Sequence, residues 1–263
     1  MSDFHDVTLN VGASLLFVLL GVAARAASAV AQHRGTRRFW GHLFHTPGVF
    51  LILGTFPRFR GFEPSGMIGV GDTRAVYELT RSLTRAGMKL EIAYSSRLQD
   101  GQLDKDVILL GGGDVNGIFR SIEESQLLGL RFEHQQTLSL YDVRQDKRYV
   151  AETVEVDLSQ VADITLDGIN IIERDGVRTA GRLVRDYGII ALLRNPYNPR
   201  RKLLIVAGLY GYGTWGGARL LSDESFLRRC MRLDSMEFEC LFEVEVLQNM
   251  PIRVVPITLR GLS

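Results

Sequence analysis

The chain has 263 residues, of which 46% are hydrophobic, so it can bury the core of one large or two small domains. Its formal net charge of +1 gives no overall electrostatic case for nucleic acid, and we expect no direct nucleic-acid partner. Cys230 and Cys240 are too few for a disulfide framework or a zinc site, and we expect no metal.

The N-terminal part predicts a single-pass membrane protein. A short acidic tail, residues 1–6, precedes an apolar stretch at residues 7–32, which has the length of a transmembrane helix. A basic, aromatic juxtamembrane linker follows at residues 33–47, a pattern that places the C-terminal part in the cytoplasm. We therefore expect an inner or plasma membrane location. A cleaved signal peptide and an amphipathic helix packed on the domain or on a partner are the alternatives.

Residues 48–263 are expected to form one cytoplasmic α/β ligand-binding domain. Apolar runs within residues 49–56, 106–110 and 203–207 are each followed by glycine, at Gly54, Gly111 and Gly208, and uninterrupted apolar runs are typical of strands in a parallel sheet. Helices are predicted after these runs, with Asp72 and Asp114 as expected N-caps. We predict a Rossmann-like fold, a mostly parallel sheet with an antiparallel excursion at residues 129–150, preceded by one transmembrane helix.

The glycine turns predict a ligand site, because the carboxyl ends of parallel strands meet at one edge of the sheet. Glycine allows a ligand to approach the backbone, and helix N-termini favour anions. We therefore expect a nucleotide-like ligand there, with no other cofactor. The alternative is that the glycines only make room for packing. The candidate ligand-binding residues at these turns are Gly54, Thr55, Gly71, Asp72, Gly112, Gly113, Asp114, Asn116, Tyr210, Gly211, Tyr212, Gly213 and Thr214.

A second polar loop, residues 194–199, adds Arg194, Asn195 and Asn198 to the candidate site. Pro196 and Pro199 fix this loop, so its side chains are held at low entropic cost. Arginine pairs with phosphate, and asparagine binds amides or bases. The alternative is a hairpin turn in which both asparagines bond their own backbone.

No complete catalytic motif is present, so catalytic residues stay unassigned. The histidines lie mostly in the N-terminal segment, and His134 stands apart from them, which disfavours histidine-based catalysis. The carboxylates at the predicted loop mouths are Asp72, Asp114 and Asp186. A nucleotide-processing hydrolase or transferase that uses Asp72 or Asp114 therefore remains an alternative to a pure binding domain.

Three motifs, GGGDVNGIF, DYGIIALLRNPYNP and LLIVAGLYGYGTWGGARLL, make residues 50–220 resemble an uncharacterised bacterial domain of regulatory and defence-type architectures. The sequence departs from that pattern where Gly113 and Asp114 replace a Gly-Pro run. The resemblance implies a cytosolic Rossmann-like domain akin to nucleotide-sensing domains of antiphage signalling.

Together these patterns predict a membrane-anchored sensor or effector that binds a nucleotide-like ligand and signals by self-association as a homo-oligomer. Bacterial antiphage defence is the setting that the resemblance implies. Besides the enzyme, a scaffold subunit of a membrane complex is the other alternative.

Overall fold

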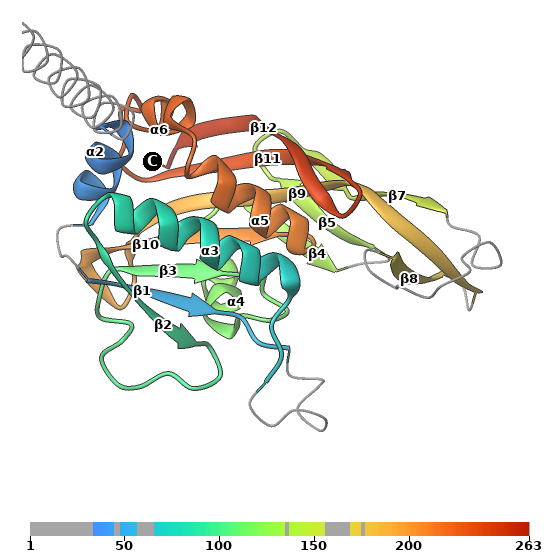
Figure 1. Cartoon of the computed structure of the whole chain (residues 1–263), viewed down its shortest axis with the longest axis horizontal. Helices are drawn as coiled ribbons and strands as arrows, with labels where there is room; N and C mark the ends of the chain where they lie inside the picture. Colours follow the sequence, from blue (N-terminus) through green and yellow to red (C-terminus); the bar gives the residue numbers. More distant parts are fainter. Residues whose placement is uncertain are drawn as a thin grey trace, which may run out of the picture.

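The computed structural model describes residues 34–44, 48–56, 66–134, 137–155, 169–174 and 177–262, with backbone alone for 169–174 and 177–180. These residues form a large mixed sheet with layers on both faces (Figure 1). The strand order is β12-β11-β9-β10-β3-β1-β2. The bounds are β1 (Gly48–Leu53), β2 (Lys89–Tyr94), β3 (Val107–Leu110), β9 (Val177–Asn195), β10 (Asn198–Gly208), β11 (Phe238–Leu247) and β12 (Met250–Gly261).

The prediction of a Rossmann-like, mostly parallel sheet is wrong. β2, β1, β3 and β10 are parallel neighbours, but β9 pairs antiparallel with both β10 and β11, and β11 pairs antiparallel with β12. Two further strands, β7 (Glu152–Glu155) and β8 (Ile169–Arg174), also pair antiparallel with β9. Residues 187–193 of β9 read as an uninterrupted apolar run because both faces of the sheet are covered there, so burial on two faces does not here imply a parallel strand.

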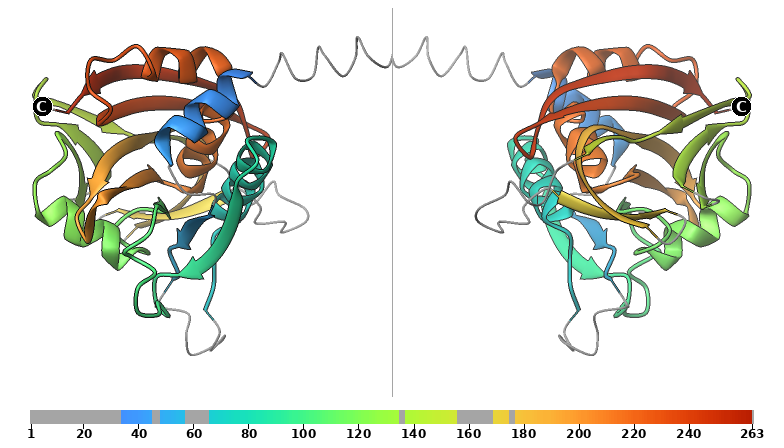
Figure 2. Two further views of the ribbon diagram at one scale, coloured as in Figure 1. Left: turned by 90° about the vertical axis from the view of Figure 1, so that its left-hand side faces the viewer. Right: turned by 90° about the vertical axis from the view of Figure 1, so that its right-hand side faces the viewer.

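Each face of the sheet has its own core. On one face α2 (Arg34–Leu43), α3 (Val70–Arg85), α5 (Gly211–Leu220) and α6 (Glu224–Cys230) cover a cluster that includes Trp40, Leu79 and Phe242. On the other face lie α4 (Gly117–Glu124) and a three-stranded antiparallel sheet of β4 (Leu130–His134), β5 (Leu138–Asp142) and β6 (Lys147–Val150). Figure 2 shows these two layers from the sides.

The prediction of a single-pass membrane protein is contradicted, since no helix among the described residues is long and apolar enough to cross a membrane. The tail at residues 1–6 and the span predicted at residues 7–32 lie outside the described residues. Residues 34–43, within the predicted linker, form α2. Its side chains Phe39, Trp40 and Leu43 are buried in the core, and the Trp40 indole donates to Ser82 Oγ of α3 at 2.9 Å.

Helix α5 packs on the sheet through glycines rather than through large side chains. It begins at Gly211, so Gly216 and Gly217 lie inside the helix and not in the turn before it. A Cβ on Gly216 would lie 2.5 Å from Val244 Cγ2, and one on Gly217 would lie 2.7 Å from Val206 Cγ1. The helix backbone therefore contacts the sheet directly, which brings its N-terminus close to the strand ends.

Replacing Gly217 tests this close packing. We expect Gly217→Val to lower the free energy of unfolding by about 1–3 kcal/mol or more, because the added side chain overlaps Val206 and Phe242. The control is Gly41→Ala in α2, where an added Cβ meets nothing within 4 Å. That change should stabilise the helix by about 0.5–1 kcal/mol. Urea unfolding of both variants measures the difference, and a neutral Gly217→Val would contradict the packing.

Candidate functional site

The parallel strands end at one edge of the sheet, which we call the carboxyl edge. β1 ends before Gly54, β3 before Gly111, and β10 at Gly208. Helix α3, which follows β1, lies on one face, whereas α4, which follows β3, lies on the other (Figure 1). Because β1 and β3 are neighbours, their chain connections diverge at this point, and such switch points are where ligands bind in open α/β sheets.

Close backbone contacts hold the turns at this edge together. A Cβ on Gly54 would lie 2.5 Å from Val115 Cγ2, and the Thr55 N–H donates to the Val115 carbonyl at 2.9 Å. A Cβ on Gly71 would collide with the backbone of Gly211, so the N-termini of α3 and α5 lie side by side. For Gly54 and Gly71, the need for packing space is therefore visible in the structure.

The N-terminus of α5 is capped from within the chain. The carboxylate of Asp186, at the point where β9 reaches the carboxyl edge, accepts the N–H groups of Tyr187 at 2.8 Å, Tyr210 at 3.2 Å and Gly213 at 2.5 Å. Burial raises the pKa of Asp186 to about 7, although these three hydrogen bonds oppose the rise. The Asp186 carboxyl group thus already occupies the glycine-rich turn that the sequence favoured for phosphate.

Asp72 links α3 to the same turn. It lies in the first turn of α3, is 5% exposed, and forms a side-chain hydrogen bond with Thr214 of α5. The Thr214 hydroxyl in turn accepts the Gly208 N–H at 3.2 Å. Burial raises the pKa of Asp72 to about 6, and the bond with Thr214 opposes part of that rise. Asp72 is therefore a buried tie between two helices and does not serve as an N-cap.

The first turn of α4 is capped by Asn116 and not by the predicted Asp114. Asn116 Oδ1 accepts the N–H groups of Ile118 and Phe119, and its amide donates to the carbonyls of Ile52 and Leu110. All of its hydrogen-bonding groups are used within the fold, so Asn116 holds β1, β3 and α4 in register.

Helix α3 differs from α4, α5 and α6 in its first turn. Its N-cap is Gly69, which offers no side-chain acceptor, whereas Asp223 caps α6 as Asn116 caps α4. Among the described residues, no side chain accepts the N–H groups of Val70 or Gly71. Exposed apolar side chains surround this turn and form what we call the edge patch: Phe56, Met67, Val70 and Tyr210.

Asp114 lies beside groups that sequence reasoning missed. The exposed Asp114 carboxylate is 3.4 Å from His134 Nε2, and the neighbouring Arg120 donates twice to the Gly113 carbonyl. Burial raises the pKa of Glu123 to about 7 despite the N–H bond from Phe132, and Asp114 contributes to the rise. No local signal joins His134 to Asp114, because the contact depends on the three-stranded sheet lying over α4.

Arg194, Asn195 and Asn198 do not join the glycine turns. They lie where β9 turns into β10, at the opposite end of a strand on the order of 30 Å long. The Asn195 amide donates to the carbonyls of Leu103 and Lys105, and Asn195 Oδ1 accepts the Tyr197 N–H. Arg194 pairs with Glu237 at 2.8 Å. The structure therefore separates these three residues from the rest of the candidate set.

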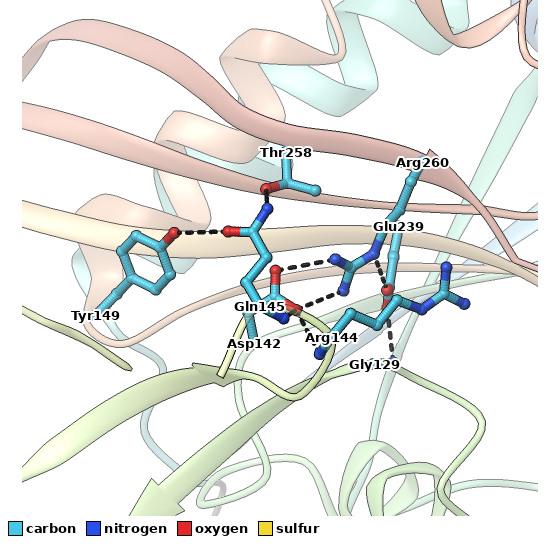
Figure 3. Close-up of polar contacts among 8 residues, drawn as sticks. All are labelled: Gly129, Asp142, Arg144, Gln145, Tyr149, Glu239, Thr258 and Arg260. Atoms are coloured by element: carbon cyan, nitrogen blue, oxygen red, sulfur yellow. Dashed lines mark hydrogen bonds and ion pairs between the residues drawn. The ribbon is translucent and has the colours of Figure 1, made fainter. Parts of the chain in front are cut away.

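A buried ionic cluster fastens the three-stranded sheet to the β11–β12 hairpin (Figure 3). Arg260 donates to both oxygens of Asp142, at 2.9 and 3.0 Å, and to Glu239 at 2.7 Å. Both carboxylates are fully buried. Glu239 also accepts the Gly129 N–H at 2.8 Å, and Gln145 bridges Tyr149 and Thr258. Because every charged group here has partners within the fold, the cluster is a structural tie.

No protein-family model matches the chain, and no curated protein matches it at a significant level. Within the described ranges, no three or more His, Cys, Asp or Glu side chains are grouped so that they could hold a metal ion. At the carboxyl edge the described residues offer the first-turn N–H groups of α3, the exposed apolar side chains of the edge patch and the carboxyl groups of Asp72, Asp114 and Asp186.

The raised pKa of Asp72 predicts a specific pH dependence of stability. Between pH 3.8 and about 6 the folded chain keeps a proton that the unfolded chain has lost, so this contribution to stability falls as the pH rises. The Asp72→Asn variant has no ionisable group at this position, so its stability lacks this decrease with rising pH. Relative to wild type, its free energy of unfolding should rise by about 2–2.5 kcal/mol between pH 4 and pH 7.

Urea unfolding across this pH range checks the Asp72 prediction, and Asp114→Asn controls for the loss of a carboxylate at the same edge. Parallel pH profiles for wild type and Asp72→Asn would show that burial does not hold the proton on Asp72.

The ionic cluster predicts a large effect for one arginine and a small one for another. Arg260→Met should lower the free energy of unfolding by about 3–5 kcal/mol, because it leaves Asp142 and Glu239 buried without a countercharge. Arg253→Met breaks an exposed pair with Glu245 on the same hairpin and should cost less than about 1 kcal/mol. Equal losses in urea unfolding would contradict the structural role of the cluster.

Proposed function

We propose that the described domain binds a nucleotide-like ligand at the carboxyl edge. In this proposal the phosphate lies at the N-terminus of α3, against the N–H groups of Val70 and Gly71. The base or another flat group lies on the edge patch. The observation that carries the proposal is that α3 begins uncapped at the switch point between β1 and β3.

The contrast among helices supports this location. Asn116 accepts the N–H groups of Ile118 and Phe119 in α4, Asp186 accepts one N–H group of α5, and Asp223 accepts one of α6. The first turn of α3 has no such side-chain acceptor within the described part of the chain, and it lies at the positive end of a 16-residue helix dipole. A phosphate oxygen is the kind of acceptor that such a turn binds best.

The edge patch supports a ligand with a flat apolar part. Phe56 pairs with Met67 by a backbone hydrogen bond, and Val70 follows at the start of α3. Tyr210 lies next to Gly211, whose backbone contacts Gly71. Exposed aromatic rings beside a phosphate-binding turn suit a nucleobase, since every base presents a π-face.

Self-association on ligand binding belongs to the same proposal, and its support is the resemblance to domains of antiphage signalling. A ligand that contacts both the first turn of α3 and the edge patch would lie beside Phe56 and Met67, which are exposed at the carboxyl edge. A second copy of the chain could recognise the bound ligand there.

A second candidate function is nucleotide processing by Asp114. The observation that favours it is the contact of Asp114 with His134, because an imidazole beside a carboxylate is a common general base. Both side chains are about half exposed, so a substrate at the carboxyl edge can reach them. Asp72 and Asp186 are less suited to catalysis, because both are buried and bonded within the fold.

Charge placed at the start of α3 tests the binding proposal. Val70 is 78% exposed, and Val70→Glu puts a carboxylate where the phosphate is proposed to lie. The substitution suits a helix N-terminus, so the fold should persist. We expect affinity for a nucleoside phosphate to fall about tenfold or more, which is about 1.4 kcal/mol of binding free energy. Native mass spectrometry with a panel of nucleotides and cyclic oligonucleotides identifies a compound that binds the wild-type protein. Calorimetry then measures the affinity of that compound for wild type and for Val70→Glu.

The matched control is Tyr77→Glu, the same change of charge two turns along α3 at another exposed position. Its affinity should stay within about twofold of wild type. Equal losses in both variants, or no adduct with any probe, would overturn the proposal. Consumption of the nucleotide that is lost in Asp114→Asn would favour the second candidate instead.

A further inference from the structure

Six exposed arginines lie on three neighbouring helices and have no carboxylate partner among the described residues. We call them the arginine face; its members are Arg34, Arg37 and Arg38 of α2, Arg81 and Arg85 at the C-terminal end of α3, and Arg229 of α6. Three arginines on β-strands differ, because each has a carboxylate partner: Arg148 pairs with Glu133, Arg185 with Glu152, and Arg253 with Glu245.

Helix packing gathers these six side chains at one end of the molecule. Arg37 Nε donates to the Arg85 carbonyl at 3.0 Å, which joins α2 to the end of α3. On its other side α2 meets α6, where a Cβ on Gly35 would lie 3.3 Å from the Glu224 carboxyl group. Figures 1 and 2 both show α2 between the end of α3 and α6.

Helical spacing then directs the arginines outward. Arg34, Arg37 and Arg38 stand at positions i, i+3 and i+4 of α2, opposite the buried Trp40 and Leu43. Arg81 and Arg85 stand at i and i+4 of α3 on its exposed side. Of the acidic side chains on these helices, Glu224 pairs with Arg228, and Glu78 lies one turn before Arg81. Six guanidinium groups therefore form a surface of one sign with little neutralising charge of its own.

We infer that the arginine face binds the phosphodiester backbone of a nucleic-acid duplex. Guanidinium groups match phosphate oxygens with paired hydrogen bonds, and they stay charged at any physiological pH. Like charges held together in the free protein repel one another, and a line of phosphates relieves that repulsion. Neutralised phosphates release counterions, which adds a driving force that does not depend on base sequence.

The apolar side chains of these helices distinguish a duplex from other anionic partners. Phe39 and Trp40 of α2 and Phe226 of α6 are buried. A helix that docks on an anionic lipid surface presents such side chains to the acyl region, and a single-strand binder presents aromatic rings to unstacked bases. The exposed sides of α2 and α6 carry no Phe, Tyr or Trp, and α3 adds one exposed tyrosine, Tyr77, one turn before Arg81. Six guanidinium groups beside a single exposed tyrosine fit contact with a regular phosphate backbone best.

Salt-dependent binding to labelled duplexes tests the inference with the full-length chain. We expect two unrelated duplexes of about 20 base pairs to bind with equal affinity, weakening steeply between about 50 and 200 mM salt. Replacing Arg37, Arg38 and Arg85 together by Gln should weaken binding about a hundredfold or more at low salt. The same change should reduce the slope of log affinity against log salt by about 3, or about 1 for each phosphate that is no longer neutralised.

The matched control replaces Arg148, Arg185 and Arg253 by Gln, which removes the same charge from the strands. Its affinity should stay within about threefold of wild type, because nonlocal charge is screened beyond about 10 Å. Equal losses in the two triple variants would show that net charge alone matters and would overturn the assignment. Absence of duplex binding at low salt, or tighter binding to phosphatidylserine vesicles or polyglutamate than to the duplex, would also overturn it.

Val70→Glu separates this inference from the proposed nucleotide site. The substitution lies at the opposite end of α3 from Arg81 and Arg85, so duplex affinity should stay unchanged in this variant. A loss of duplex binding there would place the nucleic acid at the carboxyl edge and contradict the arginine face.

Discussion

The candidate site depends on the hydrogen bonds by which the buried Asp186 side chain holds the turn after β10 and the N-terminus of α5 at the carboxyl edge. Because β9 runs antiparallel to β10, the point where β9 enters the core lies at the edge where the parallel strands finish. A side chain near the start of that buried run can therefore reach the N-terminus of α5, which an all-parallel sheet would leave to a ligand. One buried carboxylate thus joins β9, the turn after β10 and α5. The glycines of α5 allow this because they bring the helix down onto the sheet.

The same sheet separates charge along its strands. Carboxylates gather at the carboxyl edge in Asp72, Asp114 and Asp186, whereas the arginine face lies near the other end, where α3 finishes against α2. In the net charge of +1, the negative charges at one end and the positive charges at the other nearly cancel, so the sum shows neither cluster. An argument from net charge against nucleic acid assumes an even distribution, and helices far apart in the sequence make the distribution uneven. The long-range field of the folded protein depends on that arrangement and not on the sum.

Apolar runs and glycines predict the positions of β1, β3 and β10 and the meeting of their turns at one edge, because burial and turn chemistry are local properties. Strand direction is not local. A buried run reads alike in either direction, so the polar loop at Arg194 is predicted at the wrong edge when β9 is taken as parallel. The contact of His134 with Asp114 and the ties of Arg260 join segments with no sequence relation, and only the folded sheet brings them together.

The turn with the most glycine is the least available for an external anion. Its richness in glycine follows from close contact, since Gly208 and Gly213 leave space for backbone and for the Asp186 carboxylate. A binding turn needs donors that the fold leaves unpaired, and glycine content does not report that. Among the described residues at the carboxyl edge, α3 begins at a glycine cap that offers no side-chain acceptor to its first N–H groups. The capping of each helix, more than the glycine count of each loop, therefore decides where this edge can hold a phosphate.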